Sequence, residues 1–304
     1  MRIAIGPAHA DFAVAAVEAG GGTVVELGSP ADGLVWLSSK DTDMLVEVLR
    51  DQPDIRWVQL PFAGVENAVA TGIVDDTRVW TCAKGSYAKP VAEHALMLAL
   101  AGLRVLPTRI RARSWGKPEG RTLYGAPVTI LGGGGITEEL LRLLQPFAVQ
   151  ATVVRRRAGE PVAGAARVVD QSGLASVLRG SLVVFLALAL TPATKGIIGA
   201  REMDLIGPDG WLVNVARGGH IDTDALVSAL AQGRLGGAAL DVTDPEPLPD
   251  GHPLWDEPRC IITPHTADTW EMVLPPLVER ISTNVARLVA GQPLVGVVDP
   301  HAGY

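Results

Sequence analysis

A run of four glycines, 132–135, follows directly on the apolar segment 128–131 and precedes a segment of helical character, 137–144. Glycine reaches backbone conformations with positive φ and lets another group approach the backbone closely. A helix that begins there directs free N–H groups and a partial positive charge out of its first turn. A strand, a glycine turn and a helix in this order predict a parallel α/β sheet with an anion-binding turn.

The spacing inside this turn is that of a dinucleotide-binding motif with one change. Gly132, Gly134 and Thr137 stand at the glycine positions of the G-x-G-x-x-G pattern, so threonine replaces the third glycine. Such glycines let a pyrophosphate approach the backbone, and the third one lets the helix pack closely on the strand. The threonine therefore raises the question of how closely this helix approaches its sheet. A flexible surface turn is the alternative interpretation.

Short apolar segments alternate with helical segments along most of the chain, which is typical of parallel sheets covered on both faces. The expected strands are 2–6, 23–27, 33–37, 56–60, 78–82, 128–131, 150–154, 182–188, 211–214, 237–242 and 260–263. The expected helices are 12–19, 43–49, 65–70, 89–111, 137–144, 173–178, 201–206, 223–232 and 271–290. At 304 residues, the chain is long enough for two domains of ordinary size.

Composition narrows the classes of partner. The net charge of -7 supplies no basic field for nucleic acid or an acidic membrane surface. Pro7, His9 and Asp11 interrupt any signal-peptide segment, and the apolar run 182–190 is far shorter than the ~20 residues that span a bilayer. Cys82 and Cys260 form no CxxC pair, so neither a disulfide framework nor a metal site is expected. We expect a soluble cytoplasmic protein that binds neither nucleic acid nor membrane.

Three arginines stand where such dinucleotide motifs usually place an acidic residue. That residue, ~20 positions downstream of the glycines, binds the ribose 2′-hydroxyl. Here Arg155, 23 positions after Gly132, begins the run Arg155–Arg157. Arginine pairs with a 2′-phosphate, which a carboxylate would repel. The sequence therefore predicts NADP(H) as the preferred cofactor, with NAD(H) as the second option. A solvated basic turn without a ligand is the alternative.

The second half of the chain carries three further motifs. The segment from Asn214 reads NVARGGHID, the segment from Gly237 reads GAALDVTDPEP, and TPHTA begins at Thr263. With TPAT at 191–194, AGV at 63–65 and VAEH at 91–94, the chain closely resembles the D-isomer-specific 2-hydroxyacid dehydrogenase family over nearly its whole length.

The resemblance implies a role for particular residues. Arg217 corresponds to the substrate-binding arginine, Glu246 to its carboxylate partner and His265 to the acid/base histidine. Asp241 corresponds to the aspartate that meets the nicotinamide carboxamide, and Ala63 and Gly64 to the substrate loop. The residues expected to bind the cofactor are Gly132, Gly134, Gly135, Ile136, Arg155, Arg156, Thr191, Val215, Ala216 and Asp241, and those expected to bind substrate are Ala63, Gly64, Arg217 and His265.

These residue types suit reduction of a 2-keto acid. Hydride arriving at the C2 carbon leaves negative charge on the carbonyl oxygen, and a protonated histidine can neutralise it in the same step. A neighbouring carboxylate orients the imidazole and favours its charged form. Arginine polarises the carbonyl and pairs with the substrate carboxylate. The remaining histidines lack such support, and His94 is expected to pack within the long helix.

The resemblance further implies two doubly wound parallel-sheet domains with a cleft between them. A flavodoxin-like substrate domain would comprise residues 1–90 and 268–304, and a Rossmann nucleotide domain residues 91–267. It also implies a homodimer and a small 2-keto acid substrate, with glyoxylate and hydroxypyruvate the best candidates. Two alternatives stay open: a 3-phosphoglycerate dehydrogenase-type enzyme, and a nucleotide-binding corepressor or sensor of the same fold.

Two acidic or basic positions have no assigned role. Asp268 stands where the family commonly continues with glycine, three positions beyond the histidine of TPHTA. It either faces away from the substrate or narrows the choice of substrate. Lys84 precedes the long helix and either faces solvent or helps to hold an anion.

Overall fold

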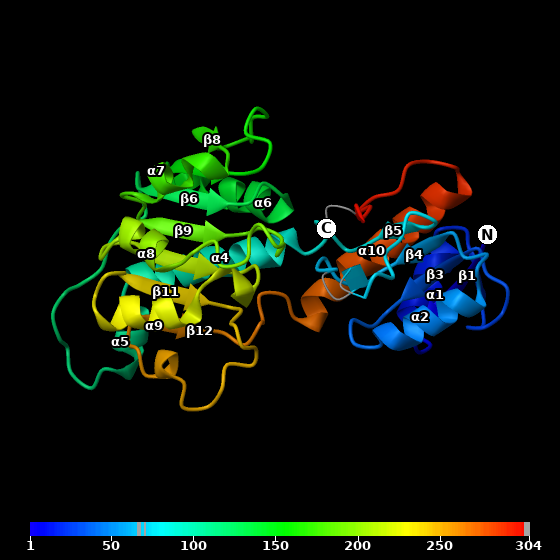
Figure 1. The fold of residues 1–304 in the computed structure, drawn as a ribbon, viewed down its shortest axis with the longest axis horizontal. Helices are drawn as coiled ribbons and strands as arrows, with labels where there is room; N and C mark the ends of the chain where they lie inside the picture. The colour runs from blue at the N-terminus through cyan, green and yellow to red at the C-terminus, as the bar shows by residue number, and fades with distance from the viewer. Residues whose placement is uncertain (66–67, 70, 301–304) are drawn as a thin grey trace. The chain divides into compact units, whose positions relative to one another are not determined.

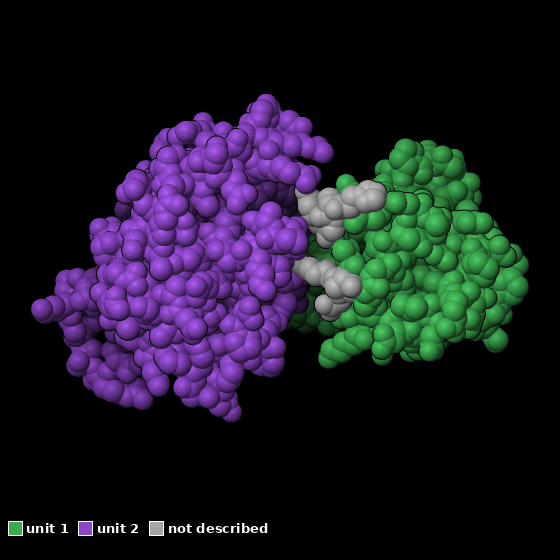
Figure 2. Space-filling view, in the orientation of Figure 1, with its two compact units in different colours: residues 1–87, 269–304 green, residues 88–268 purple. Residues whose placement is uncertain are grey.

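The chain forms two compact units, shown in different colours in Figure 2. Unit 1 comprises residues 1–87 and 269–304, and unit 2 comprises residues 88–268. The computed structural model describes residues 1–65, 68–69 and 71–300. Each unit is built on one parallel sheet, which confirms the predicted α/β class with two parallel-sheet domains.

Unit 1 contains a five-stranded parallel sheet in the order β2-β1-β3-β4-β5 (Figure 1). Its strands are β1 (Arg2–Gly6), β2 (Thr23–Val25), β3 (Gly33–Trp36), β4 (Trp57–Gln59) and β5 (Val79–Thr81). Its helices include α1 (Asp11–Ala19), α2 (Thr42–Asp51) and α10 (Trp270–Val289). The core is dominated by the large side chains of Trp36, Trp57 and Trp80, each about 1% exposed. Strands β1, β3 and β4 are buried along almost their whole length, as is typical of a parallel sheet covered on both faces.

Unit 2 contains a seven-stranded parallel sheet in the order β12-β11-β10-β9-β6-β7-β8. Its strands are β6 (Pro127–Leu131), β7 (Gln150–Val154), β8 (Arg167–Val169), β9 (Val183–Leu186), β10 (Trp211–Asn214), β11 (Gly237–Leu240) and β12 (Cys260–Ile262). Its helices are α4 (Ala88–Leu103), α5 (Leu106–Arg111), α6 (Gly135–Leu144), α7 (Leu174–Leu178), α8 (Ala200–Ile206) and α9 (Thr223–Ala231), with 3₁₀ turns η1 (Gln145–Phe147), η2 (Gln171–Gly173), η3 (Gly218–His220) and η4 (Pro253–Trp255).

The strand order of unit 2 reverses between β6 and β9, because the chain moves outward through β7 and β8 before it crosses back. In doubly wound sheets, ligands bind beyond the carboxyl ends of the strands at such a reversal. The glycine run 132–135 follows β6 and lies at this point. The topology therefore places the predicted cofactor turn where this architecture binds ligands.

Several predicted boundaries differ from the structure. In the helix predicted over 89–111, Pro107 is expected to cause a kink or to end a first segment, and the chain does form two helices there: α4 ends at Leu103 and α5 begins at Leu106. Val105, with φ of 54°, separates them, and Pro107 lies in the first turn of α5. Proline tolerates a first helical turn but interrupts a helix interior, which explains the break. The helix expected at 65–70 falls partly on residues 66, 67 and 70, which lie outside the described residues. Within the described part of the chain, no helix is long and apolar enough to cross a membrane.

Candidate active site

The glycine turn after β6 is shaped by close contacts that exclude side chains. Gly132 has φ of +114°, and a Cβ atom there would collide with the carbonyl of Ala187 after β9. Gly134 is the N-cap of α6, and open space lies where its side chain would be. Gly135 and Ile136 form the first turn of that helix. The turn thus presents bare backbone and a helix N-terminus, which suits a bound phosphate.

Thr137 is accommodated inside this turn. Its side chain is fully buried, and its hydroxyl donates a hydrogen bond to the Gly132 carbonyl at 3.1 Å. The polar atom therefore has a partner that the glycine turn itself supplies. Threonine at the third position of the motif is compatible with a helix packed closely on the sheet.

Arg155 lies against the glycine turn. It follows β7, and its Cδ atom would be 2.9 Å from a Cβ atom built on Gly133. Its Nη2 atom is 2.7 Å from Oε2 of Glu160, and Nη1 of Arg157 is 3.9 Å from Oε1 of the same carboxylate. Arg156 is exposed on the same turn. Two guanidinium groups thus surround one carboxylate beside the glycine turn, which shows that an anionic group can be held there.

The segment after β9 lies next to the glycine turn after β6, because β9 and β6 are neighbouring strands at the reversal of strand order. The Thr194 hydroxyl accepts a hydrogen bond from the Thr191 N–H at 2.8 Å and donates to the Ala189 carbonyl at 2.8 Å. His220 is fully buried and places Nδ1 3.0 Å from the Thr194 carbonyl and Nε2 3.2 Å from the Leu188 carbonyl. Thr191 therefore stands on a tightly bonded turn. Thr194 and His220 received no role from the sequence, although both stand inside motifs that it displays.

Asn214, at the end of β10, shapes the turn that carries Arg217. This buried amide accepts from the Ala216 N–H at 3.0 Å and donates to the Arg217 carbonyl at 2.8 Å. Nη1 of Arg217 donates to the Ala216 carbonyl at 2.7 Å. The side chains of Val215 and Ala216 are buried, so any contact that these residues make with a cofactor passes through their main chain. The next residue, Gly218, has no room for a side chain, because a Cβ atom there would collide with the main chain of Thr243.

Asp241, directly after β11, organises the turn at 263–267. Its side chain is 1% exposed. It accepts hydrogen bonds from the Thr263 hydroxyl at 2.6 Å, the Thr266 N–H at 2.9 Å and the Ala267 N–H at 3.0 Å. Nε2 of His94 lies 3.3 Å from the same carboxylate. Burial by itself raises the pKa of the Asp241 carboxyl, but these hydrogen bonds outweigh it and lower the pKa to about 2.

His265 and Glu246 form a hydrogen-bonded pair. Nδ1 of His265 is 2.6 Å from Oε1 of Glu246, and the Thr243 N–H donates to Oε2 of that carboxylate at 3.4 Å. Because the carboxylate accepts at Nδ1, the other ring nitrogen, Nε2, is left to meet a substrate. About 44% of the His265 side chain and 41% of the Glu246 side chain are exposed, so both are accessible.

His265 adopts an uncommon backbone conformation, with φ of 50°. Its N–H donates to the main-chain carbonyls of Asp241, at 2.8 Å, and Thr263, at 3.0 Å. A residue other than glycine reaches this left-handed region at a cost, which the surrounding hydrogen bonds must offset. The direction of the imidazole is therefore set by the turn as well as by Glu246.

Asp268 is half-buried and belongs to the same electrostatic environment. Burial raises the pKa of its carboxyl, and the neighbouring charge of Asp241 acts in the same direction. His265 and Arg217 oppose this rise through their positive charge. Asp268 therefore shares the electrostatic environment of Asp241, His265 and Arg217, and its part in the choice of substrate stays a prediction.

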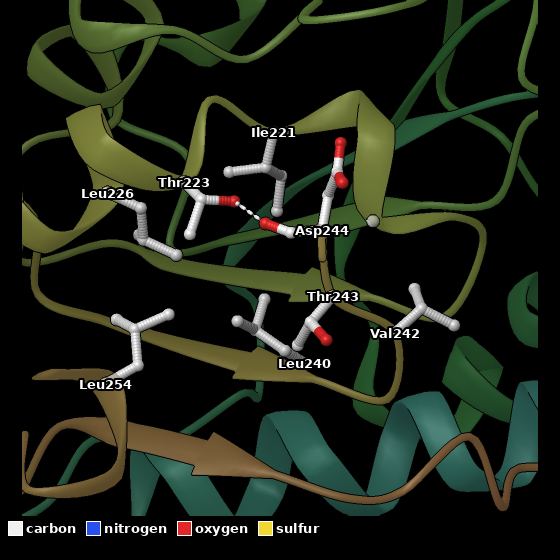
Figure 3. Close-up of a pocket in the computed structure, with 9 residues that line it drawn as sticks. Ile221, Thr223, Leu226, Leu240, Val242, Thr243, Asp244 and Leu254 are labelled. Carbon is white, nitrogen blue, oxygen red and sulfur yellow. Dashed lines mark hydrogen bonds between the residues drawn. The ribbon is translucent and has the colours of Figure 1, made fainter. Parts of the chain in front are cut away.

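A small apolar pocket lies beneath the 243–244 segment that leads to Glu246 (Figure 3). Aliphatic side chains line it, namely those of Ile221, Leu226, Leu240, Val242 and Leu254. The Thr223 hydroxyl donates to the Asp244 carbonyl at 2.6 Å at its edge. Such a lining does not suit a carboxylate substrate.

The predicted substrate loop belongs to unit 1. Sγ of Cys82 lies 3.8 Å from the Ala63 carbonyl, and the Tyr87 hydroxyl donates to the Pro61 carbonyl at 2.6 Å. Arg280 donates to the carbonyls of Cys82 at 2.6 Å and Lys84 at 2.9 Å. These contacts tie the segments around 61–63 and 82–87 together. The contact of Lys84 with Arg280 is made by its main-chain carbonyl. Substrate binding by Ala63 and Gly64 stays a prediction.

Comparison with known proteins provides independent information. A family profile described as "D-isomer specific 2-hydroxyacid dehydrogenase, NAD binding domain" matches residues 94–267, more than half of the chain. Glyoxylate/hydroxypyruvate reductase A of Klebsiella pneumoniae strain 342 is 30% identical over 278 residues, covering 89% of this chain and 81% of the relative.

Two solved structures resemble the whole chain. A D-isomer-specific 2-hydroxyacid dehydrogenase from Xanthobacter autotrophicus Py2, in complex with NADPH and MES, has a TM-score of 0.87 at 26% identity, covering 100% of this chain and 99% of the other. An NADPH-dependent glyoxylate/hydroxypyruvate reductase from Sinorhizobium meliloti, in complex with NADP and sulfate, has a TM-score of 0.82 at 25% identity with the same coverage.

The depressed pKa of Asp241 predicts a pH-dependent contribution to stability. A carboxyl with a pKa of about 2 in the folded state, against ~3.9 unfolded, stabilises the fold above pH ~4 and loses this effect as the pH falls towards 2. In urea titrations, the gap in free energy of unfolding between the wild type and Asp241→Asn should shrink by about 1 kcal/mol from pH 6 to pH 3. Asp250→Asn, at an exposed position, is the control. A gap that widens on acidification would contradict this assignment.

Proposed function

This chain belongs to the D-isomer-specific 2-hydroxyacid dehydrogenase family, and we propose that it is an NADPH-dependent reductase of small 2-keto acids, with glyoxylate and hydroxypyruvate as its best substrates. The observation that carries the proposal is the 2.6 Å contact between Nδ1 of His265 and Glu246. Arg217, Glu246 and His265 follow the carboxyl ends of three adjacent parallel strands, β10, β11 and β12. The family consists of oxidoreductases, which fits a proton donor paired with an anion-binding arginine.

The proposed chemistry assigns one task to each side chain. A bound nicotinamide supplies the hydride that adds to the C2 carbon. Nε2 of His265 gives its proton to the carbonyl oxygen as that oxygen gains negative charge, so the product is a neutral alcohol. Glu246 holds Nδ1 and stabilises the positive ring before the transfer. Arg217 pairs with the substrate carboxylate and polarises the carbonyl.

The residues of unit 2 fit a nicotinamide dinucleotide that carries a 2′-phosphate. The Gly132–Gly135 turn has no room for side chains at Gly132 and offers a helix N-terminus. Arg155 lies against that turn and already binds a carboxylate. The Xanthobacter and Sinorhizobium relatives are described with NADPH or NADP, which supports the same preference here. NAD(H) is the second option.

The domain roles follow from the same assignment. We infer that unit 2 is the nucleotide-binding domain and unit 1 the substrate domain, close to the ranges 91–267 and 1–90 with 268–304. Three further assignments remain predictions: Ala63 and Gly64 as substrate ligands, Asp241 and Thr191 as cofactor ligands, and a cytoplasmic location. So does the homodimer. It is supported by exposed side chains after α4, where Leu106 is 44%, Ile110 70% and Trp115 97% exposed.

A keto-acid panel tests the proposed activity. The purified protein would be given glyoxylate, hydroxypyruvate, pyruvate, 3-phosphohydroxypyruvate and oxaloacetate, with NADPH and NADH in parallel, and cofactor oxidation followed at 340 nm. We expect the highest kcat/KM for glyoxylate or hydroxypyruvate with NADPH. A preference for 3-phosphohydroxypyruvate would favour the 3-phosphoglycerate dehydrogenase type, and binding of NADPH without turnover across the panel would favour a sensor.

The role of Arg155 predicts a change of cofactor preference. Arg155→Asp removes a charge-assisted hydrogen bond and adds a repulsive charge, so the Kd for NADPH should rise at least ~10-fold while that for NADH changes less than ~3-fold. Cofactor fluorescence titration measures both constants. Arg142→Asp is a matched control, because Arg142 carries the same charge in an exposed ion pair 2.9 Å from Glu139. Equal weakening of both cofactors by Arg155→Asp would refute the 2′-phosphate role.

A further inference from the structure

His94 of α4 makes polar contacts that its place in an apolar helix does not reveal. Its Nε2 atom is 3.0 Å from the Thr263 hydroxyl and 3.3 Å from Oδ1 of Asp241. The side chain is only 14% exposed. Packing within the helix, as the sequence suggested, therefore describes only part of its environment.

Counting protons around Thr263 fixes the direction of these contacts. A hydroxyl has one hydrogen to donate. The Thr263 hydroxyl donates it to Asp241 at 2.6 Å, because an ionised carboxylate accepts only. Towards His94, the hydroxyl can therefore only accept. Nε2 of His94 must carry a hydrogen, which it shares between the hydroxyl and the carboxylate.

His94 contacts Thr263 and Asp241, the two groups whose hydrogen bonds hold the 263–267 turn that contains His265. Asp241 accepts from Thr263 on one side of His265 and from Thr266 and Ala267 on the other. The strained residue between them, with φ of 50°, depends on both flanks. Loss of the Nε2–H donor would leave the buried carboxylate of Asp241 and the half-buried hydroxyl of Thr263 each with one partner fewer.

We propose that His94 is a positioning residue of the active site, which fixes the 263–267 turn through Thr263 and Asp241 and so sets the direction of the His265 imidazole. The consequence for catalysis rests on the proposed function, in which His265 donates the proton. The consequence for the turn does not, because it follows from hydrogen bonds within unit 2.

The experiment compares three variants of the full-length protein with the wild type. His94→Leu removes the donor, His94→Gln restores an N–H donor of similar reach, and Thr263→Val removes the hydroxyl between His94 and Asp241. Met97→Leu, at an exposed position of the same helix, is the matched control for changes in α4. Hydrogen–deuterium exchange of the 263–267 segment is measured by mass spectrometry, together with kcat and the Kd for NADPH.

We expect His94→Leu and Thr263→Val to accelerate exchange of the Thr266 and Ala267 amides at least ~5-fold, whereas His94→Gln and Met97→Leu stay within ~2-fold of the wild type. With the best 2-keto acid, kcat of His94→Leu should fall about 10-fold while its Kd for NADPH stays within ~3-fold, and His94→Gln should recover most of the rate.

Unchanged exchange in His94→Leu would overturn the proposal, whatever the activity and whatever Thr263→Val does. Equal losses in His94→Leu and His94→Gln would also overturn it, because they would indicate a purely steric role. A wild type without turnover would refute the proposed function alone, since the exchange result still decides whether His94 holds the turn. If His94→Leu does not fold, Thr263→Val and His94→Gln carry the comparison.

Discussion

One buried carboxylate, that of Asp241, holds together the part of the molecule in which the chemistry is proposed. It accepts hydrogen bonds from three positions that flank His265, and its own carbonyl accepts from the His265 N–H. A carboxylate can be buried at this depth only when donors surround it. The same donors tie the 263–267 turn to Asp241. The position of the imidazole therefore depends on an interaction that involves neither substrate nor cofactor.

The parallel sheet explains why these groups come together. Five parts of the proposed site each follow the carboxyl end of a strand, and those strands are consecutive neighbours in the sheet from β6 to β12. They are Gly132, the 187–194 segment, Arg217, Asp241 and His265. Residues that are far apart in sequence therefore meet along one edge of unit 2. Short polar side chains then shape each turn locally. Asn214 does so before Arg217, and Thr194 does so beside Thr191.

The sheet class and the motifs could be predicted from the sequence because both depend on local pattern, namely the apolar period, the glycine spacing and short motifs that resemble a known family. Contacts between distant segments could not be predicted in this way. His94 and Thr263 are 169 positions apart, and nothing near either residue indicates the other. Likewise, the pairing of Arg155 with Glu160 and the hydrogen bond from Thr137 to Gly132 depend on side-chain geometry within a turn. The break after α4 could be expected from Pro107, whereas the left-handed conformation of Val105 just before it could not.

The central claim is that His265 donates the proton in reduction of a 2-keto acid. The most direct measurement is kcat/KM of His265→Ala for the substrate that the wild type reduces fastest, alongside its thermal unfolding midpoint and its Kd for NADPH. We expect a fall of at least ~100-fold in kcat/KM, with folding and cofactor binding preserved. A folded His265→Ala protein that retains kcat/KM within ~3-fold of the wild type would contradict it.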